Sequence, residues 1–151
     1  MNGDTPTEEE VLVGHLESYS LKNFEGSSAE NEQALRDLPE GSRQILKVEK
    51  YAMINGSWIV STANPLVGSI PSIRIDGSPT PSSDATNAYL YFVDASALKR
   101  PSYSAAHKRI NLYLDIRSIR MTIEQLKHSH QFIWVGHFAG GHLYGDFHSA
   151  P

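Results

Sequence analysis

Three imidazoles, a carboxylate and a phenol lie close together near the end of the chain, on both sides of a glycine pair at residues 140–141. A Gly-Gly dipeptide between two runs rich in apolar and aromatic residues favours a tight turn, which predicts a hairpin of residues 131–139 and 142–148. A two-residue turn would pair Ala139 with His142. Because side chains alternate across a strand, this pairing sorts the hairpin residues onto two faces.

The predicted inner face of this hairpin is apolar, with Trp134, Phe138, Leu143 and Phe147. The predicted outer face carries most of the polar groups: Ile133, Val135, His137, His142, Tyr144, Asp146 and His148. A histidine beside a carboxylate is the usual arrangement of a general base. The candidate catalytic residues are therefore His137, Tyr144, Asp146 and His148. The same set is also what a polar, solvent-facing hairpin would carry.

Imidazole and carboxylate groups also suit zinc, iron or manganese, so the hairpin is a candidate metal site as well. His142 and His148, however, are six residues apart, which is roughly 20 Å along a strand. One metal ion could then reach only neighbouring ligands, and a third ligand would have to come from His107, His128 or His130. Two protein ligands make a poor site, so we predict no resident metal or other cofactor.

Basic residues cluster between positions 99 and 120, with Tyr103 and Tyr113 among them. The predicted binding residues are Lys99, Arg100, Lys108, Arg109, Arg117 and Arg120. On a sheet such a group could bind phosphates while the tyrosines stack on bases, or it could form a solvated face. Residues 41–151 hold eleven bases and seven acids, a net charge of +4, which is far below that of domains that bind nucleic acid tightly.

The length of 151 residues suits one domain. Residues 1–40 hold ten acids and two bases, a net charge of −8. We expect residues 1–27 to be a flexible acidic segment with a short apolar patch at 11–16, and residues 28–151 to be a single globular β-rich domain. The chain contains no cysteine, which excludes disulfides, iron–sulfur clusters and cysteine-based zinc sites.

Several elements follow from the local patterns. Good helix formers at 29–38 before Pro39 predict a short helix, and Asn55–Gly56 predicts a hairpin of 45–54 with 57–63. The alternation of residues 72–76 indicates a short edge strand, and the apolar run 88–94 indicates a central strand covered on both faces. The expected strand at 109–117 is half-exposed, and a short helix capped by Ser118 follows it to about residue 127.

These elements predict an α+β, β-rich fold: an antiparallel sheet or partly open barrel of five or six strands with one or two short helices. No apolar run is long enough to span a membrane, and no signal peptide is visible at the N-terminus, so we expect a cytoplasmic protein.

The favoured function is a non-enzymatic binding or assembly module that contacts a protein or other anionic partner through its mildly basic sheet surface. A protein partner or self-association is preferred over nucleic acid or an anionic membrane surface. The alternative is a small enzyme or ligand-binding barrel that uses the His/Asp/Tyr cluster of the C-terminal hairpin, with or without a metal. In that case the aromatic strand 89–92 would line its cavity.

Overall fold

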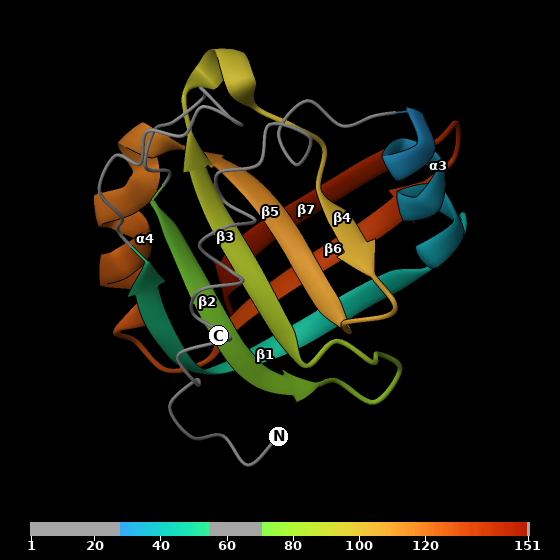
Figure 1. Cartoon of the computed structure of the whole chain (residues 1–151). Coiled ribbons are helices and arrows are strands. Elements are labelled where there is room, and N and C mark those ends of the chain that lie inside the picture. Colours follow the sequence, from blue (N-terminus) through green and yellow to red (C-terminus); the bar gives the residue numbers. More distant parts are fainter. Residues whose placement is uncertain (1–27, 55–70, 151) are drawn as a thin grey trace.

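The computed structural model describes residues 28–54 and 71–150 of the chain, which form a strongly bent, β-rich sheet with two α-helices (Figure 1). The strands in chain order are β1 (Arg43–Ile54), β2 (Ser72–Pro79), β3 (Asn87–Val93), β4 (Ser102–Ser104), β5 (Arg109–Asp115), β6 (Gln131–Phe138) and β7 (His142–Ser149). The helices are α3 (Ser28–Asp37) and α4 (Ile119–Leu126), with single 3-10 turns η1 (Ala95–Ala97) and η2 (Ile116–Ser118).

The strand order in the sheet is β4-β5-β3-β2-β1-β6-β7. All neighbouring pairs are antiparallel except β3 and β5, which run parallel. After β3, the chain passes through η1 and β4 and returns to the end of the sheet at which β3 began. β5 therefore starts beside the first residue of β3 and runs parallel to it. The prediction of a β-rich fold with few helices is confirmed. The sheet is mixed and has seven strands among the described residues, where five or six antiparallel strands were expected.

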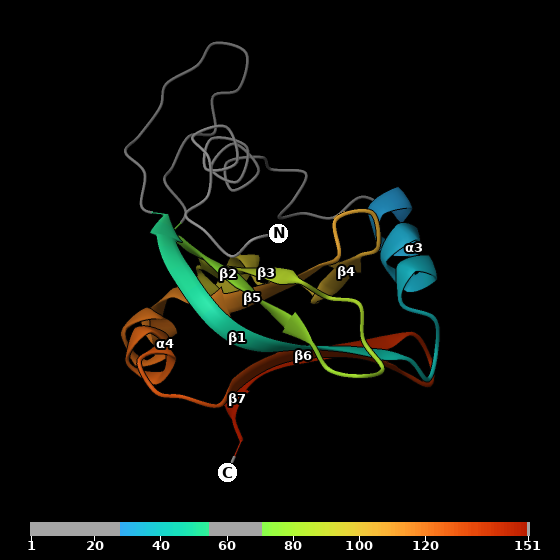
Figure 2. The same cartoon turned by 90° about the horizontal axis from the view of Figure 1, so that it is seen from below.

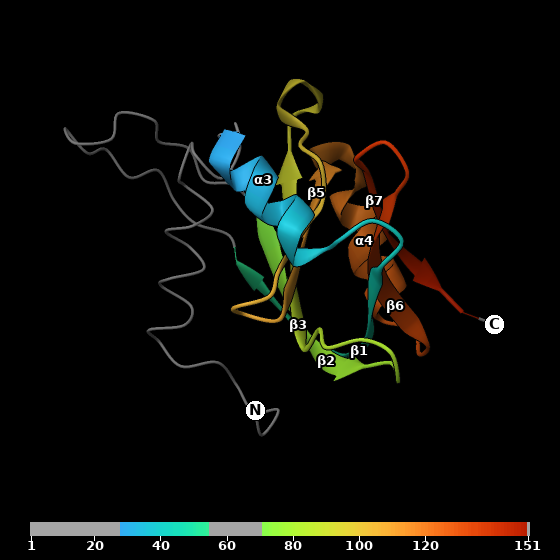
Figure 3. The ribbon, with the colours of Figure 1, turned by 90° about the vertical axis from the view of Figure 1, so that its right-hand side faces the viewer.

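The bent sheet encloses the main hydrophobic core as a nearly closed barrel (Figure 2). Both helices pack against this core: Leu35 belongs to α3, whereas Ile123 and Leu126 belong to α4. The two helices lie at opposite sides of the sheet (Figures 1 and 2), and Figure 3 views the molecule from the side of α3. Both were predicted, although the Ser118 hydroxyl donates to the carbonyl of Asp115 instead of capping α4. Within the described residues, no helix is both long enough and apolar enough to cross a membrane.

β2 is a central strand, which corrects the prediction of an edge strand at 72–76. It pairs with β1 on one side and with β3 on the other. Its polar positions Arg74 and Asp76 are buried, and their side chains form an ion pair of 3.3 Å. One face of β2 is therefore apolar and lies in the core, and the other face is polar but also buried. Alternation of apolar and polar residues does not reveal that a charged pair is buried.

β3 is buried along its entire length, as the apolar run predicted. Ala88, Leu90 and Phe92 point into the main core, whereas Tyr89 and Tyr91 belong to a second cluster on the outer side of the sheet. The first strand of the predicted Asn55–Gly56 hairpin is β1. Its turn and second strand, like the acidic segment 1–27, lie outside the described residues.

Candidate functional site

The turn of the C-terminal hairpin contains three residues, not the predicted two. Phe138 of β6 pairs with His142 of β7, which leaves residues 139–141 in the turn. Gly140 and Gly141 have φ values of 81° and 76°, in the left-handed region that glycine adopts without steric penalty. The longer turn shifts the register by one residue. Consequently β7 keeps its predicted orientation, but every side chain of β6 points to the face opposite the predicted one.

The shift corrects the predicted sorting of β6. Ile133 and Val135, which were expected outside, are fully buried in the main core, and His137 is also buried. Trp134 and Phe138, which were expected in the core, lie on the outer face beside residues of β7. The outer face of the hairpin is therefore mainly aromatic, with one carboxylate and two imidazoles from β7.

His137 links β6 to the segment that follows α3. Its Nδ1 lies 2.6 Å from the carbonyl oxygen of Leu38, and because a carbonyl only accepts, Nδ1 carries the proton and donates. The backbone of His137 accepts from the amide of Gly41 at 2.9 Å and donates to the carbonyl of Ser42 at 3.0 Å. This histidine thus lies on the opposite face of the hairpin from the other three predicted catalytic residues.

Asp146 and His148 form a hydrogen-bonded pair on the outer face. The Asp146 carboxylate lies 2.6 Å from Nδ1 of His148, and their side chains are 31% and 45% exposed. The contact orients the imidazole and directs its proton to Nδ1, so Nε2 is the nitrogen that can accept a proton or a hydrogen bond. The ring of Tyr144, the third predicted residue on this face, packs against the indole of Trp134 at 5.5 Å.

Aromatic rings run along the outer side of the hairpin and are partly open to solvent. Trp134 contacts Tyr144 and, edge to face at 6.1 Å, Phe138. Phe138 and Tyr144 are 48% and 47% exposed. We call this surface the hairpin aromatic surface: Phe132, Trp134, Phe138, Tyr144 and His148. Exposed aromatic groups of this kind are enriched at binding interfaces, where they supply a large apolar area together with polar edges.

A groove of about 390 Å³ adjoins the hairpin aromatic surface. It is lined by Arg43, Ile45, Thr80, Phe132, Trp134, His148 and Ala150. The rings of Phe132 and His148 stack at 6.3 Å and form part of its wall. Most of the lining is apolar, and Arg43 adds a positive charge. This combination suits an apolar side chain that is accompanied by an anionic group.

Metal ligands do not converge in the part of the chain that the structure describes: no group of three His, Asp or Glu side chains there could hold one ion. His128 and His130 follow α4 and line a different, more polar hollow of about 480 Å³ beside β1. The backbone of His130 has a φ of 61°. His107 is exposed in the turn between β4 and β5. None of these three histidines therefore joins the Asp146–His148 pair in a group of metal ligands among the described residues.

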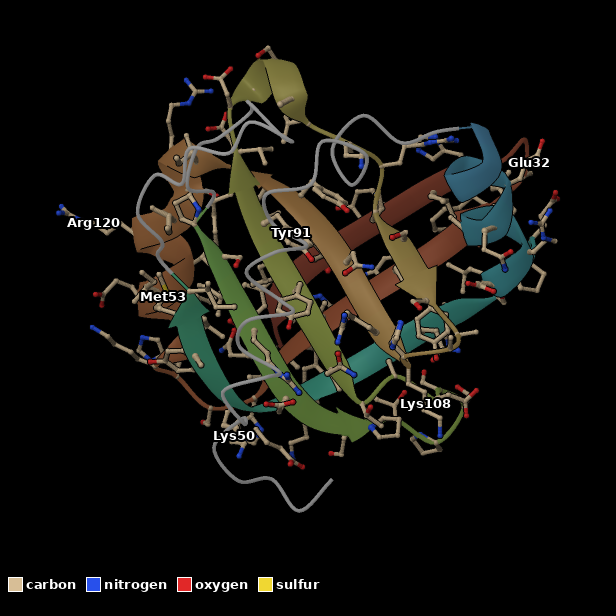
Figure 4. All side chains as sticks on the ribbon, viewed as in Figure 1. Glu32, Lys50, Met53, Tyr91, Lys108 and Arg120 are labelled. Atoms are coloured by element: carbon tan, nitrogen blue, oxygen red, sulfur yellow. The ribbon has the colours of Figure 1, made fainter. Side chains whose placement is uncertain are left out.

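The predicted basic residues do not form one patch. Arg120 on α4 and Lys108 lie at opposite sides of the sheet (Figure 4). Arg117 is paired with Asp115 at 2.7 Å; this hydrogen-bonded pairing lowers the pKa of Asp115 to about 2 and raises the pKa of Arg117. Arg100 is exposed in the connection to β4. These basic residues are close together in the sequence but not in space, because the chain crosses the sheet between their positions.

Lys99 and Arg109 share the outer side of β3 and β5 with tyrosine rings. The Lys99 ammonium lies 5.1 Å from the ring centroid of Tyr113, and the Arg109 guanidinium lies 4.4 Å from that of Tyr89. Such distances correspond to cation–π contacts. Arg109 also donates from Nε to Asn87 at 2.7 Å. Of the six predicted basic residues, Lys99 thus contacts Tyr113, one of the two tyrosines predicted beside them, whereas Arg109 contacts Tyr89, which was not predicted.

The groove includes residues that sequence reasoning did not select. Arg43 is the first residue of β1, and Thr80 directly follows β2. Trp134 was predicted to lie in the core. The alternation of β6 reads equally well with either face inward, because both faces carry large apolar side chains. The glycine pair is also compatible with a three-residue loop that contains a left-handed glycine, which is common in hairpins. That alternative would have predicted the observed register.

Comparisons with known proteins do not identify a relative. No family model matches the chain, and neither a curated protein nor a solved structure is significantly similar to it. The assignment of a function therefore depends on the geometry of the described residues.

Proposed function

We propose that the protein is a non-enzymatic binding module that docks a segment of a partner protein on its C-terminal hairpin. The observation that carries this proposal is the hairpin aromatic surface beside an apolar groove. Phe138 and Tyr144 are about half exposed, and Trp134 contacts both rings and lines the groove. Partly exposed tryptophan and tyrosine at the centre of a patch are typical of residues that dominate the free energy of association.

The chemistry of the groove favours a peptide segment with an apolar or aromatic side chain next to a carboxylate. Ile45, Phe132 and Trp134 would contact the apolar side chain, whose transfer from water supplies most of the driving force. Arg43 would pair with the carboxylate and fix the orientation of the segment. The whole chain has a net charge of −4, so the preference for a carboxylate comes from Arg43 at short range and not from the overall charge.

Nucleic acid fits this groove less well than a peptide. Tight binding of a phosphate backbone requires several Lys or Arg contacts, each of which releases counterions. Among the described residues that line the groove, only Arg43 carries a permanent positive charge. Stacking on Trp134 without phosphate contacts would give little affinity at physiological salt, so we assign the surface to a polypeptide.

The Asp146–His148 pair supports a second candidate function, acid–base catalysis at the edge of the groove. The carboxylate orients the imidazole through the bond of 2.6 Å, and Nε2 could take a proton from a hydroxyl or a water molecule. In this alternative, Asp146→Asn would abolish turnover of a chromogenic ester such as p-nitrophenyl acetate while leaving peptide binding intact. Equal hydrolysis by the wild type and the variant would exclude it.

Selection from a random peptide library displayed on phage, with the full chain as bait, tests the binding function. We expect acidic peptides with a large apolar residue, and we expect Trp134→Ala to weaken their binding more than about tenfold, as for an interface hot spot. Arg43→Glu should weaken acidic peptides specifically. The matched control is Met121→Ala, which removes a side chain on α4 that is 69% exposed and should change nothing.

Two outcomes would overturn the proposal. Selected peptides that bind Trp134→Ala as tightly as the wild type would place the binding surface elsewhere. Concentration-dependent dimerisation that Trp134→Ala abolishes, without selection of any peptide, would show that a second copy of this chain occupies the surface.

A further inference from the structure

A second cluster of apolar and aromatic side chains lies on the outer side of the sheet, away from the hairpin, with members from β1, β3 and β5. We call this side the tyrosine face: Ile54, Tyr89, Tyr91, Val93 and Tyr113. The rings of Tyr91 and Tyr113 stack at 5.1 Å with an interplanar angle of 15°. Figure 4 shows Tyr91 over the middle of this face. It is independent of the hairpin aromatic surface, and its members Tyr89, Tyr91 and Tyr113 lie in regions that the sequence analysis considered as parts of a cavity or of a basic binding surface.

The residues of this face have the accessibility of core residues. Tyr89 and Tyr91 are 1% and 3% exposed, although the apolar residues of α3 and α4 pack against the other cluster, inside the barrel. A phenol ring has a large apolar area, so keeping it from water stabilises the fold. The tyrosine face is thus suited to a covering segment that combines apolar and polar groups.

The charge of the tyrosine face is positive. Arg74 is opposite Tyr89 in the register, Lys50 is opposite Asp76, and Lys99 and Arg109 contact tyrosine rings. Residues that face each other in neighbouring strands lie on the same side of the sheet. Two carboxylates lie on the same side: Asp76, which is paired with Arg74, and Asp115, which is opposite Val93 and is paired with Arg117. Lys50, Lys99 and Arg109 leave this side with an excess of positive charge, which favours an acidic partner.

The chain itself contains a segment with the complementary charge. Residues 1–27 hold six acids and one lysine, a net charge of −5, and three of these acids, Glu8, Glu9 and Glu10, directly precede the apolar residues Val11–Leu12–Val13. Carboxylates next to aliphatic side chains match cations next to tyrosine rings.

The segment is also long enough to reach the face. It is joined to α3, which packs beside β4 at the border of the tyrosine face. Crossing from β4 to β2 requires about 15 Å at normal strand spacing, whereas 27 residues span up to about 90 Å when extended. A tethered segment needs little intrinsic affinity, because its local concentration is high.

We propose that the acidic N-terminal segment, residues 1–27, binds the tyrosine face of its own chain. Its carboxylates pair with the cations of the face, and its apolar residues at 11–13 cover the tyrosine rings. This proposal does not depend on the hairpin groove.

A nitroxide spin label tests the proposal, and the absence of cysteine from the chain allows a single labelling site. The label is attached to Gly14→Cys in the full chain, and amide signals are followed by NMR. We expect strong broadening for Tyr89, Tyr91 and Arg109 and little for β6. The broadening should diminish at 1 M salt, where the screening length is about 3 Å.

Charge reversal provides the matched control. Glu8→Lys, Glu9→Lys and Glu10→Lys together should abolish the broadening, whereas three reversals outside the segment, at Glu40, Glu49 and Glu124, change the net charge equally and should preserve it. The proposal is overturned if the label leaves the tyrosine face unaffected. It is also overturned if a label on Ser57→Cys broadens the same signals and the segment label does not, because residues 55–70 would then occupy the face.

Discussion

The indole of Trp134 packs against the backbone of Gly136: a β-carbon built on Gly136 would stand 2.5 Å from Cζ3 of the ring. The two residues lie on the same face of β6, two positions apart. The missing side chain of Gly136 therefore leaves the space in which Trp134 lies beside Phe138 and Tyr144. The aromatic surface of the hairpin depends on this glycine.

Gly136→Ala should displace the indole and weaken peptide binding by a substantial part of the loss in Trp134→Ala. The fluorescence emission of Trp134, recorded in a Trp58→Phe background, should shift as the ring changes its environment. Gly140→Ala is the control: its β-carbon would meet no atom within 4 Å, so it introduces about 1–2 kcal/mol of left-handed backbone strain without touching the ring. Unchanged emission in Gly136→Ala would refute the assigned role of the glycine.

Gly145→Ala should destabilise the closure of the barrel. The added β-carbon would stand 2.6 Å from Cδ2 of Leu112 and 3.0 Å from Cβ of Pro101, so β7 would have to move away from the strand that carries Leu112. Overpacking of this kind costs about 1–3 kcal/mol, measurable by urea unfolding. In the Leu112→Val background, Gly145→Ala should lower the free energy of unfolding by a smaller amount. An equal cost in both backgrounds would show that Leu112 is not the obstacle.

The sequence predicted the existence of the last hairpin correctly because β7 alternates clearly and a glycine pair precedes it. It did not determine whether the turn has two or three residues, since glycine suits both. One additional residue in the turn reverses the two faces of β6. Trp134 therefore lies on the outer surface, where His137 was predicted, and His137 is buried. A site that lies across two strands therefore depends on the register, which local patterns specify weakly.

Tertiary burial accounts for the other differences. The central position of β3 was readable because both of its faces are apolar, but β2 was taken for an edge strand because Arg74 and Asp76 alternate with Ile73 and Ile75. Those two charges neutralise each other inside the fold, a pairing that cannot be recognised before the neighbouring strands are known. The basic residues between 99 and 120 were scattered by the path of the chain across the sheet.

Replacing His137 tests its structural role. His137→Leu removes the donor to the carbonyl of Leu38 and should lower the free energy of unfolding by about 1–3 kcal/mol, the cost of a buried acceptor left without its partner. His137→Asn places an amide donor near the position of Nδ1 and should lose distinctly less. Hydrogen exchange at the amide of Gly41, which bonds to His137, should accelerate mainly in the leucine variant. Identical stabilities would exclude the hydrogen bond as a contributor.

Asp115 should give a pH dependence at acid pH. Hydrogen bonds from Arg117 hold the pKa of Asp115 at about 2, below the value of about 3.9 for an unfolded chain. Because the folded-state pKa is the lower one, the stabilisation is present above pH 4 and is lost as the pH falls toward 2. In an NMR titration, Arg117→Ala should raise the pKa of Asp115 toward its ordinary value, while Arg120→Ala should not. A pKa unaffected by Arg117→Ala would contradict the assigned cause.

A double-mutant cycle on Arg74 and Asp76 should show strong coupling between them. Both side chains are 8% exposed, so the single variant Asp76→Leu leaves a buried guanidinium without its carboxylate, a change that costs about 3–5 kcal/mol. Replacing both residues by apolar ones, Arg74→Met with Asp76→Leu, avoids an uncompensated charge and should be much closer to the wild type. Urea unfolding of the four proteins gives the coupling free energy. If the double variant lost the sum of the two single losses, the ion pair would contribute nothing, and β2 would owe its central place to Ile73 and Ile75 alone.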